Sequence, residues 1–327
     1  MNELANDIKN SREIKLNSAN TYAKNIAKIY KEVFNEEYDK TNINKLKKFQ
    51  IIKKYLSTLP IYTQKNLVVA IMVTIKSYKF PKYVIKKYED YFYELTTKIN
   101  NNYKTHKQSN KDKTNWVSDD YIEKVETKLK QKIKPVYHYL DDTTTKPLKN
   151  KDIDAFQQYV VFSLYTKMPP LRNNYVNTIV ITKSSSSANT KKMLDDKTHN
   201  YIDINDNKLY LYNYKTHKTY GDKILPMEDD VIDIITDWMK INPSKYLLIN
   251  VTNKIPMTSN GLTKYLNKIF KPKKVSTTLL RKYYLSQKYP VNPELEDSKR
   301  KDANMMGHSV NTQQKIYRKM VNNHTIV

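Results

Sequence analysis

Three residues near the C-terminus have side chains that can bind a phosphate or attack it. Arg281 precedes His308 by 27 positions, and Tyr317 follows His308 by nine. An arginine carries a permanent charge on a planar fork that matches phosphate oxygens. A histidine can donate a hydrogen bond or a proton near neutral pH, and a tyrosine hydroxyl can act as a nucleophile. These residue types therefore allow covalent chemistry on a phosphate.

The composition excludes several other kinds of chemistry. The chain has no cysteine, so disulfides, thiol catalysis and cysteine-built metal sites are excluded. Its three glycines, Gly221, Gly261 and Gly307, are too scattered for a phosphate-binding loop. The six histidines show no metal-ligand spacing. We therefore expect no cofactor, no metal and no small-molecule substrate.

The charge of the chain predicts a polyanionic partner. Lysine and arginine total 58 against 33 aspartate and glutamate, which gives a formal net charge of +25 over 327 residues. A field of this sign concentrates nucleic acid. The alternative is compositional drift, because lysine, asparagine, isoleucine and tyrosine are the residues that AT-rich codons supply. Drift alone predicts evenly spread lysines and no motif.

The elements that position these residues fall into three parts. Apolar residues at helical spacing predict four helices in a bundle, at about 18–33, 46–56, 63–75 and 83–99. The boundaries we predict are a helical domain at 1–100, a basic linker at 101–116 and a second domain at 117–327. The linker has little to bury and carries four lysines that can lie along the phosphates of a nucleic acid, Lys104, Lys107, Lys111 and Lys113.

The second domain is mixed. Periodicity predicts helices at about 118–133, 152–165, 229–240, 260–270 and 277–287, two more near the C-terminus, and strands at 177–182, 201–204 and 208–214. The predicted fold class is mainly α with a small antiparallel β-sheet. The longest apolar run, Leu67 to Ile75, is too short to cross a membrane, and Met1 to Leu4 opens no signal peptide. We expect an intracellular protein with no membrane contact.

Two sequence boxes carry a family resemblance. Around the C-terminal set, 306–309 reads Met-Gly-His-Ser, and Tyr317 follows its histidine by nine positions. Upstream, 163–166 reads Ser-Leu-Tyr-Thr, and 169–172 reads Pro-Pro-Leu-Arg. Together with Arg281 these boxes resemble the tyrosine recombinases, the integrase family of site-specific DNA recombinases. The Pro-Pro-Leu-Arg form is most similar to recombinases of large DNA viruses, virophages and related mobile elements.

The resemblance covers essentially the whole chain and implies both a fold and an activity. It implies a helical core-binding domain that binds DNA, joined to an α+β catalytic domain. It also implies a recombinase or integrase that cuts and rejoins double-stranded DNA through a 3′-phosphotyrosine, without metal or ATP. A homotetramer on synapsed DNA sites is the implied assembly. A viral or mobile-element protein would act on host or viral DNA, in the nucleus or the cytoplasm.

The same resemblance implies catalytic roles. Tyr317 is the nucleophile, Arg172 and Arg281 hold the non-bridging phosphate oxygens, and His308 adds a hydrogen bond. A lysine on the β-hairpin protonates the leaving 5′ oxygen. Lys215, followed by threonine as in the family's turn, is the favoured candidate, and Lys218 is the alternative.

The chain departs from the family pattern near both arginines. Thr278 stands where the family has a histidine, three positions before Arg281. A threonine can bond a phosphate oxygen, but it cannot act as an acid or base near neutral pH. Tyr175 stands where the family tends to have a carboxylate, so Asn174 or backbone would orient Arg172. Lys282, beside Arg281, is predicted to contact DNA.

Two other functions remain open at this point. A type IB topoisomerase-like enzyme would use the same residues to nick and close one strand, and the threonine at 278 favours it slightly. A catalytically inactive DNA-binding protein descended from a recombinase is the other alternative, and the retained tyrosine, arginines and histidine weigh against it.

Overall fold

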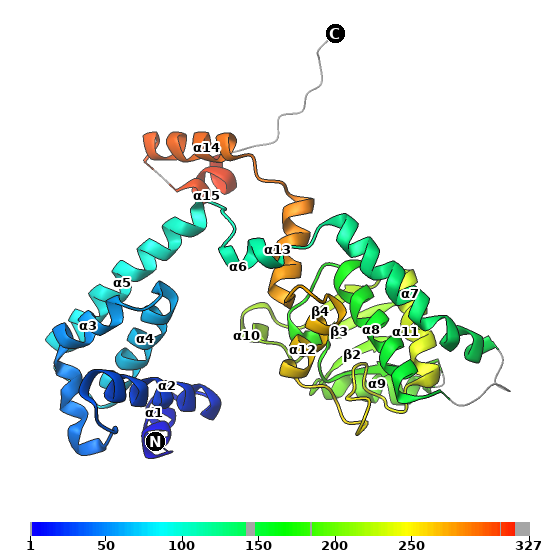
Figure 1. The fold of residues 1–327 in the computed structure, drawn as a ribbon, viewed down its shortest axis with the longest axis horizontal. Helices are drawn as coiled ribbons and strands as arrows, with labels where there is room; N and C mark the ends of the chain where they lie inside the picture. The colour runs from blue at the N-terminus through cyan, green and yellow to red at the C-terminus, as the bar shows by residue number, and fades with distance from the viewer. Residues whose placement is uncertain (1, 142–147, 184, 308, 318–327) are drawn as a thin grey trace, which may run out of the picture. The chain divides into compact units, whose positions relative to one another are not determined.

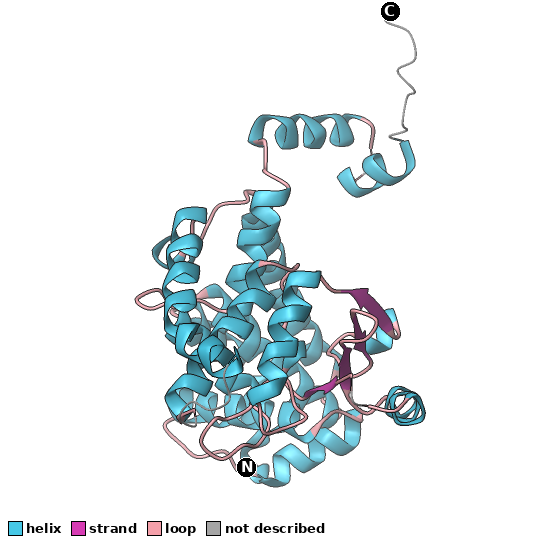
Figure 2. Ribbon diagram, turned by 90° about the vertical axis from the view of Figure 1, so that its right-hand side faces the viewer, coloured by secondary structure: helices cyan, strands magenta, loops and turns pink. Residues whose placement is uncertain are grey.

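The computed structural model describes residues 2–141, 148–183, 185–307 and 309–317. The chain forms two compact units, Met1–Lys107 and Gln108–Val327, and each is described by itself. Figure 2 shows a chain built mainly of helices with one small sheet. The predicted class, mainly α with a small β-sheet, is confirmed.

The first unit is a helical bundle with one helix more than the sequence predicts. Its elements are α1 (Asn2–Arg12), α2 (Leu16–Ile29), the π-turn η1 (Tyr30–Phe34), the 3₁₀ segment η2 (Lys40–Lys47), α3 (Phe49–Ser57), α4 (Ile61–Ser77) and α5 (Lys82–Lys104). The added helix α1 packs on α2 and α4 through Leu4, Ala5 and Ile8, all buried. These three apolar residues at helical spacing were the available signal for it.

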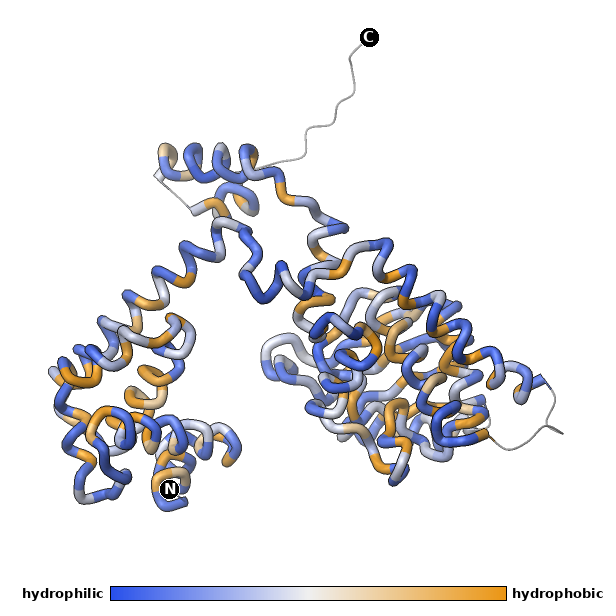
Figure 3. The backbone as a smooth tube through the Cα atoms, in the orientation of Figure 1, coloured by the Kyte–Doolittle hydropathy of each residue, from blue (hydrophilic) through white to orange (hydrophobic). Residues whose placement is uncertain are grey.

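The centre of this unit is α4, which the sequence predicts as its buried helix. Leu67, Val68, Ile71 and Ile75 are all fully or almost fully buried. The one buried hydroxyl on the helix, that of Thr74, donates to the carbonyl of Ala70 at 2.9 Å, so it is satisfied within its own turn. Figure 3 shows hydrophobic stretches in orange along the helices of this unit.

The second unit surrounds a larger core. Its helices are α6 (Asn110–Asn115), α7 (Asp119–Asp141), α8 (Asn150–Thr166), η3 (Asn173–Tyr175), α9 (Ser187–Asp196), α10 (His217–Tyr220), α11 (Asp229–Ile241), α12 (Ser259–Ile269), α13 (Thr277–Lys288), α14 (Pro293–Met305), α15 (Val310–Thr312) and η4 (Gln313–Tyr317). Helix α8 is central, because α7, α11, α12 and α13 all pack on it (Figure 1). Helix α9 was not predicted.

The sheet contains β1 (Thr178–Ile181), β2 (Asn200–Asp203), β3 (Lys208–Leu211) and β4 (Lys223–Pro226), in that order. Our expectation of a purely antiparallel sheet is corrected, because β1 and β2 run parallel, with Thr178 opposite Asn200. The reason is the crossover through α9, which returns the chain to start β2 beside β1 in the same direction. The pairs β2–β3 and β3–β4 are antiparallel.

The sheet lies between two apolar layers, which explains why its first three strands are buried. One face, including Val180, Ile202 and Leu209, joins the main core of the helices. The other face carries Ile179, Ile181, Tyr201 and Tyr210, which pack with Met193 and Leu194 of α9. The alternation of side chains along each strand therefore serves both layers. The sheet thus gives the loops at its ends a rigid base.

The segment predicted as a linker is helical over much of its length. Helix α5 continues to Lys104, and α6 begins after Ser109, whose hydroxyl caps it by accepting from the N–H of Asp112 at 3.1 Å. The carboxylate of Asp112 accepts in return from the N–H of Ser109 at 3.4 Å. This reciprocal capping stabilises a helix that has no apolar face of its own.

Candidate functional site

The predicted first arginine lies just beyond the end of α8. Tyr165, in the last turn of that helix, is 1% exposed, and its hydroxyl donates to the carbonyl of Arg172 at 2.7 Å. The Tyr165 ring packs edge-on against Tyr175, with ring centroids 5.5 Å apart. The backbone of Arg172 is therefore held from the core while its side chain stays exposed.

The environment of Tyr175 explains why position 175 does not hold the carboxylate that the resemblance led us to expect there. Tyr175 is fully buried, and burial raises its pKa far above the ordinary value. It fills core volume beside Tyr165 and carries no charge that could orient a guanidinium. The hydrogen bond from Tyr165 and the contacts of Asn173 and Asn174 hold this segment instead.

Helix α13 brings Thr278 and Arg281 to the same region. The hydroxyl of Ser276 caps the helix by accepting from the N–H of Leu279 at 3.2 Å. In the first turn, the hydroxyl of Thr277 donates to the side-chain oxygen of Asn173 at 3.3 Å. Asn173 directly follows Arg172, so this bond joins the two segments that carry the predicted arginines. Arg281 follows one turn later and is half-buried.

The predicted hairpin lysines lie between β3 and β4. Lys215 is in the turn that follows β3, and Lys218 is in the short helix α10; both side chains are exposed. The other two lysines of this region are engaged elsewhere. Lys197 pairs with Asp222 at 2.7 Å, and the Lys223 ammonium lies 4.8 Å from the ring centre of Tyr220. Because both candidate side chains are exposed, the assignment of Lys215 or Lys218 as the proton donor stays a prediction.

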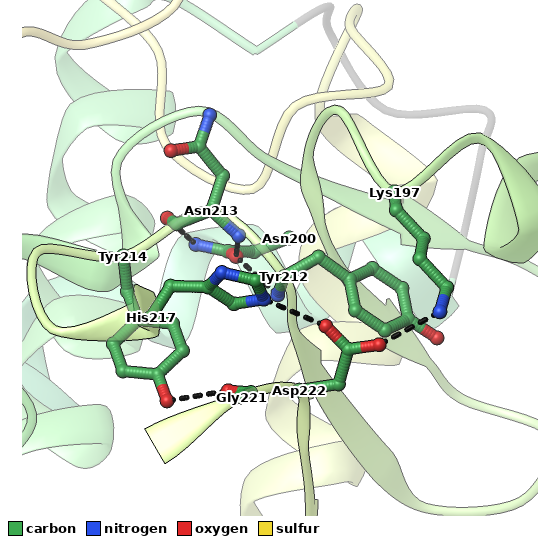
Figure 4. Close-up of polar contacts among 8 residues, drawn as sticks. All are labelled: Lys197, Asn200, Tyr212, Asn213, Tyr214, His217, Gly221 and Asp222. Carbon is green, nitrogen blue, oxygen red and sulfur yellow. Dashed lines mark hydrogen bonds and ion pairs between the residues drawn. The ribbon is translucent and has the colours of Figure 1, made fainter. Parts of the chain in front are cut away.

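Asp222 closes the turn that contains these lysines. Its carboxylate accepts from Lys197 at 2.7 Å and contacts the Nε2 atom of His217 at 2.7 Å (Figure 4). The hydrogen bonds from Lys197 and His217 lower the pKa of Asp222. Next to it, Gly221 has φ +65° and ψ −164°, a conformation nearly reserved for glycine. Its carbonyl accepts from the hydroxyl of Tyr214 at 2.6 Å.

Asn200, at the start of β2, connects this turn to the Arg172 segment. Its side-chain oxygen accepts from the N–H groups of Tyr212 and Asn213 at 3.0 and 2.8 Å. Its side-chain nitrogen donates to the carbonyls of Asn174 and Asn213 at 2.9 and 3.1 Å. Sequence reasoning missed this residue. The available signal was an asparagine at the edge of a strand, where that residue type is disfavoured.

Of the predicted C-terminal pair, the histidine and the tyrosine, the structure describes the tyrosine. Tyr317 is the last residue of η4, and it is 61% exposed. His308 lies outside the described residues. The hydrogen bonds described above join the segments of Arg172, Arg281 and Lys215. The approach of this tyrosine to the other predicted residues therefore remains a proposal.

The lysines predicted to bind DNA are all exposed: Lys104, Lys107, Lys111, Lys113 and Lys282. Lys282 forms an ion pair with Asp112 at 2.7 Å, which ties α6 to the helix that carries Arg281. Burial by itself would raise the pKa of Asp112, but hydrogen bonds from Lys282 and Ser109 and the charge of Lys282 lower it overall. Asn115 adds a second tie by accepting from the N–H of Lys274 at 2.6 Å.

Two further findings concern ligands and membranes. Within residues 2–141, 148–183, 185–307 and 309–317, no three histidine, aspartate or glutamate side chains gather as metal ligands. Over the same residues, none of the helices has both the length and the apolar character needed to span a bilayer.

Comparison with known proteins found a weak structural likeness. No protein-family model matches the chain, and the search of curated proteins found no match. Among solved structures, the crystal structure of XerA recombinase is similar to it with a TM-score of 0.33 and 13% sequence identity. That likeness covers 98% of this chain and 94% of the other. It is too low to assign an activity.

Proposed function

We propose that this protein is a tyrosine recombinase that cuts and rejoins double-stranded DNA. One observation carries the proposal: the hydrogen bond between Thr277 and Asn173 joins the segments of Arg172 and Arg281, which are 109 positions apart in the sequence. Two exposed or half-buried guanidinium groups on joined segments can bind the same phosphate. Structural ion pairing does not account for them, because neither arginine has an acidic partner among the described residues.

The proposed reaction is a transesterification. The hydroxyl oxygen of Tyr317 attacks the phosphorus, its proton passes to solvent water, and the bond between phosphorus and the 5′ oxygen breaks. The products are a 3′-phosphotyrosine and a 5′-hydroxyl, whose proton comes from Lys215. Arg172 and Arg281 stabilise the charge on the non-bridging oxygens. Rejoining is the reverse reaction with another 5′-hydroxyl, so the phosphodiester energy is conserved.

The minor roles complete the proposal. Thr278, exposed at the start of α13, contributes one hydrogen bond to a phosphate oxygen, and His308 contributes another. The exposed lysines of 104–113 bind phosphates along the duplex, which makes DNA affinity fall with salt. Strand exchange between two duplexes would take place in a homotetramer. The two units, Met1–Lys107 and Gln108–Val327, would be the DNA-binding and catalytic domains.

A covalent-adduct assay tests the proposal. The protein is incubated in EDTA with nicked duplexes from a genomic fragment library, so that the short 5′-hydroxyl strand diffuses away after cleavage. The mixture is then quenched with SDS. We expect DNA-linked protein from the wild type and none from Tyr317→Phe. Tyr289→Phe is the matched control, because Tyr289 is 62% exposed and Tyr317 is 61% exposed.

The outcomes separate the candidate functions. Adducts from the wild type and Tyr289→Phe alone support Tyr317 as the nucleophile. Adducts that persist in Tyr317→Phe would refute that role, and salt-sensitive binding without any adduct would favour the inactive DNA-binding protein. With an adduct established, transfer of the bound strand to a second duplex identifies a recombinase. Plasmid relaxation without such transfer would identify the topoisomerase-like enzyme.

A further inference from the structure

The side chain of Asn200 uses its full hydrogen-bonding capacity on the backbone of two loops. A primary amide offers two donor hydrogens and an oxygen with two lone pairs. Both donors and both lone pairs of Asn200 are occupied, by backbone groups of Tyr212, Asn213 and Asn174. The residue is 3% exposed, so little water competes for these bonds. The partners also settle the amide orientation, because N–H groups require the oxygen and carbonyls require the nitrogen.

This amide continues the sheet where the backbone pairing stops. The last strand pairs bring Tyr201 opposite Tyr210 and Thr178 opposite Asn200. Beyond Leu211 the chain leaves β3, and the side chain of Asn200 takes the place of a backbone partner for Tyr212 and Asn213 (Figure 4). The strand was predicted to reach residue 214, and this exchange of partners accounts for its earlier end.

The two loops held by Asn200 are the ones that carry two of the proposed catalytic residues. Asn174 lies two residues after Arg172, and Asn213 lies two residues before Lys215. Thr178 reinforces the first loop, since its hydroxyl also donates to the carbonyl of Asn174 at 2.9 Å. The second loop is reinforced by the side chain of Asn213, which donates to the carbonyl of Thr198 at 3.0 Å.

We propose that Asn200 is a positioning residue that holds the Lys215 turn in register with the Arg172 segment. The proposal rests on the proposed function. Asn200 touches no DNA in this role; it fixes where Lys215 delivers its proton relative to the phosphate bound by Arg172. The anchoring of Asn213 by Asn200 also favours Lys215 over Lys218 as the proton donor, because Lys215 is closer in the chain to Asn213.

A substrate with a sulfur leaving group separates this role from a purely structural one. When the 5′ bridging oxygen is replaced by sulfur, the phosphorus–sulfur bond breaks and the electron pair stays on sulfur. A thiol is far more acidic than an alcohol (the cysteine thiol has a pKa of about 8.5), so the thiolate leaves without a proton from a general acid. A variant that only misplaces Lys215 is therefore slow on ordinary DNA and recovers on sulfur-substituted DNA.

The test uses a nicked duplex that contains the cleavage site mapped in the adduct assay. With ordinary DNA, we expect Asn200→Ala to form adduct about 10–100-fold more slowly, since a displacement of about 1 Å can cost about 100-fold. With the sulfur-substituted duplex, its rate should come within about threefold of the wild type. Lys215→Ala should show the same recovery. Adding Asn200→Ala to Lys215→Ala should slow ordinary cleavage no further.

Asn242→Ala is the matched control. Asn242 is 8% exposed, its amide donates to the carbonyl of Tyr246 at 2.8 Å, and its oxygen accepts from the N–H of Ser244 at 3.1 Å. Asn242→Ala thus loses two backbone hydrogen bonds, half as many as Asn200→Ala, and neither of them is to Asn174, Tyr212 or Asn213. It should show no difference between the two substrates. If Asn200→Ala does not fold, Asn200→Ser, which keeps one donor and one acceptor, gives the comparison with a smaller loss.

Each result decides the proposal. Equal losses of Asn200→Ala on both substrates would overturn it and leave Asn200 a structural residue. Unchanged cleavage of ordinary DNA by a folded Asn200 variant would overturn it as well. These results leave the proposed function intact, because the wild type still forms its adduct. Absence of any wild-type adduct on both substrates would overturn the proposed function and this inference together.

Discussion

Gln157 in α8 provides a direct test of how the core of the second unit supports the Arg172 segment. Its side chain is fully buried. The amide nitrogen donates to the carbonyl of Ile249 at 3.0 Å, and the amide oxygen accepts from the N–H of the same residue at 2.8 Å. The side chain thus acts as a backbone partner for a buried segment, and it joins that segment to the helix that leads to Arg172.

Replacing Gln157 by leucine keeps a similar volume and removes both bonds to Ile249. It also removes the weaker bond from the amide nitrogen to the Tyr265 hydroxyl at 3.3 Å, which leaves Tyr265 bound to Asp154. Ile249 is fully buried, so its N–H and carbonyl would be left without partners. Each such loss costs about 1–3 kcal/mol, which gives about 2–6 kcal/mol for the pair. The added apolar surface of leucine returns at most about 2 kcal/mol. The difference is about 0–4 kcal/mol, so we expect Gln157→Leu to lower the free energy of unfolding by about 2 kcal/mol, the middle of that range.

The neighbouring Gln158 is the matched control. It is 5% exposed, and its amide donates to the carboxylate of Asp154 at 2.7 Å. That carboxylate also binds Lys268 and the hydroxyl of Tyr265, so it keeps partners when Gln158 is replaced. Gln158→Leu should therefore cost less than about 1 kcal/mol.

Urea unfolding followed by tryptophan fluorescence measures both variants. The chain has two tryptophans, Trp116 and Trp238, and both belong to the second unit, so the signal reports that unit. Similar losses of unfolding free energy in Gln157→Leu and Gln158→Leu would refute the reasoning. The bond to Ile249 would then be no more than incidental.

Two further predictions concern the tie of α6 and the hairpin turn. Asp112 has a pKa lowered below its ordinary value, so its pairing with Lys282 stabilises the fold above about pH 4 and loses this effect as pH falls through the lowered pKa. Asp112→Asn should thus cost about 1 kcal/mol at pH 7, and this cost should shrink in urea unfolding as the pH is lowered below about 4. A difference that stays constant with pH would contradict the pairing. Gly221→Ala should lower the unfolding free energy by about 1–3 kcal/mol, because φ is +65° while the added Cβ meets no atom within 4 Å. Equal stability would show that the turn relaxes.

The sequence alone determined the parts of this protein that depend on local pattern. Apolar residues at helical spacing predicted α2 to α5 and most helices of the second unit, because the buried face of a helix consists of apolar residues that recur every three to four positions. The proposed site residues Arg172, Arg281 and Tyr317 also come from the sequence, since residue type and spacing carry a resemblance without coordinates, and their roles stay a prediction. Helix α1 was readable in principle from Leu4 and Ile8, and it was missed.

Only the tertiary structure decided which distant segments meet. The parallel pairing of β1 and β2 depends on the path of the chain through α9, and strand direction leaves no mark in the sequence of a four-residue strand. The partners of Asn200, Asn173 and Gln157 are up to 108 positions away, as for the bond from Gln157 to the hydroxyl of Tyr265. A side-chain amide satisfies whichever backbone groups the fold leaves unpaired, and those groups are known only once the chain is folded.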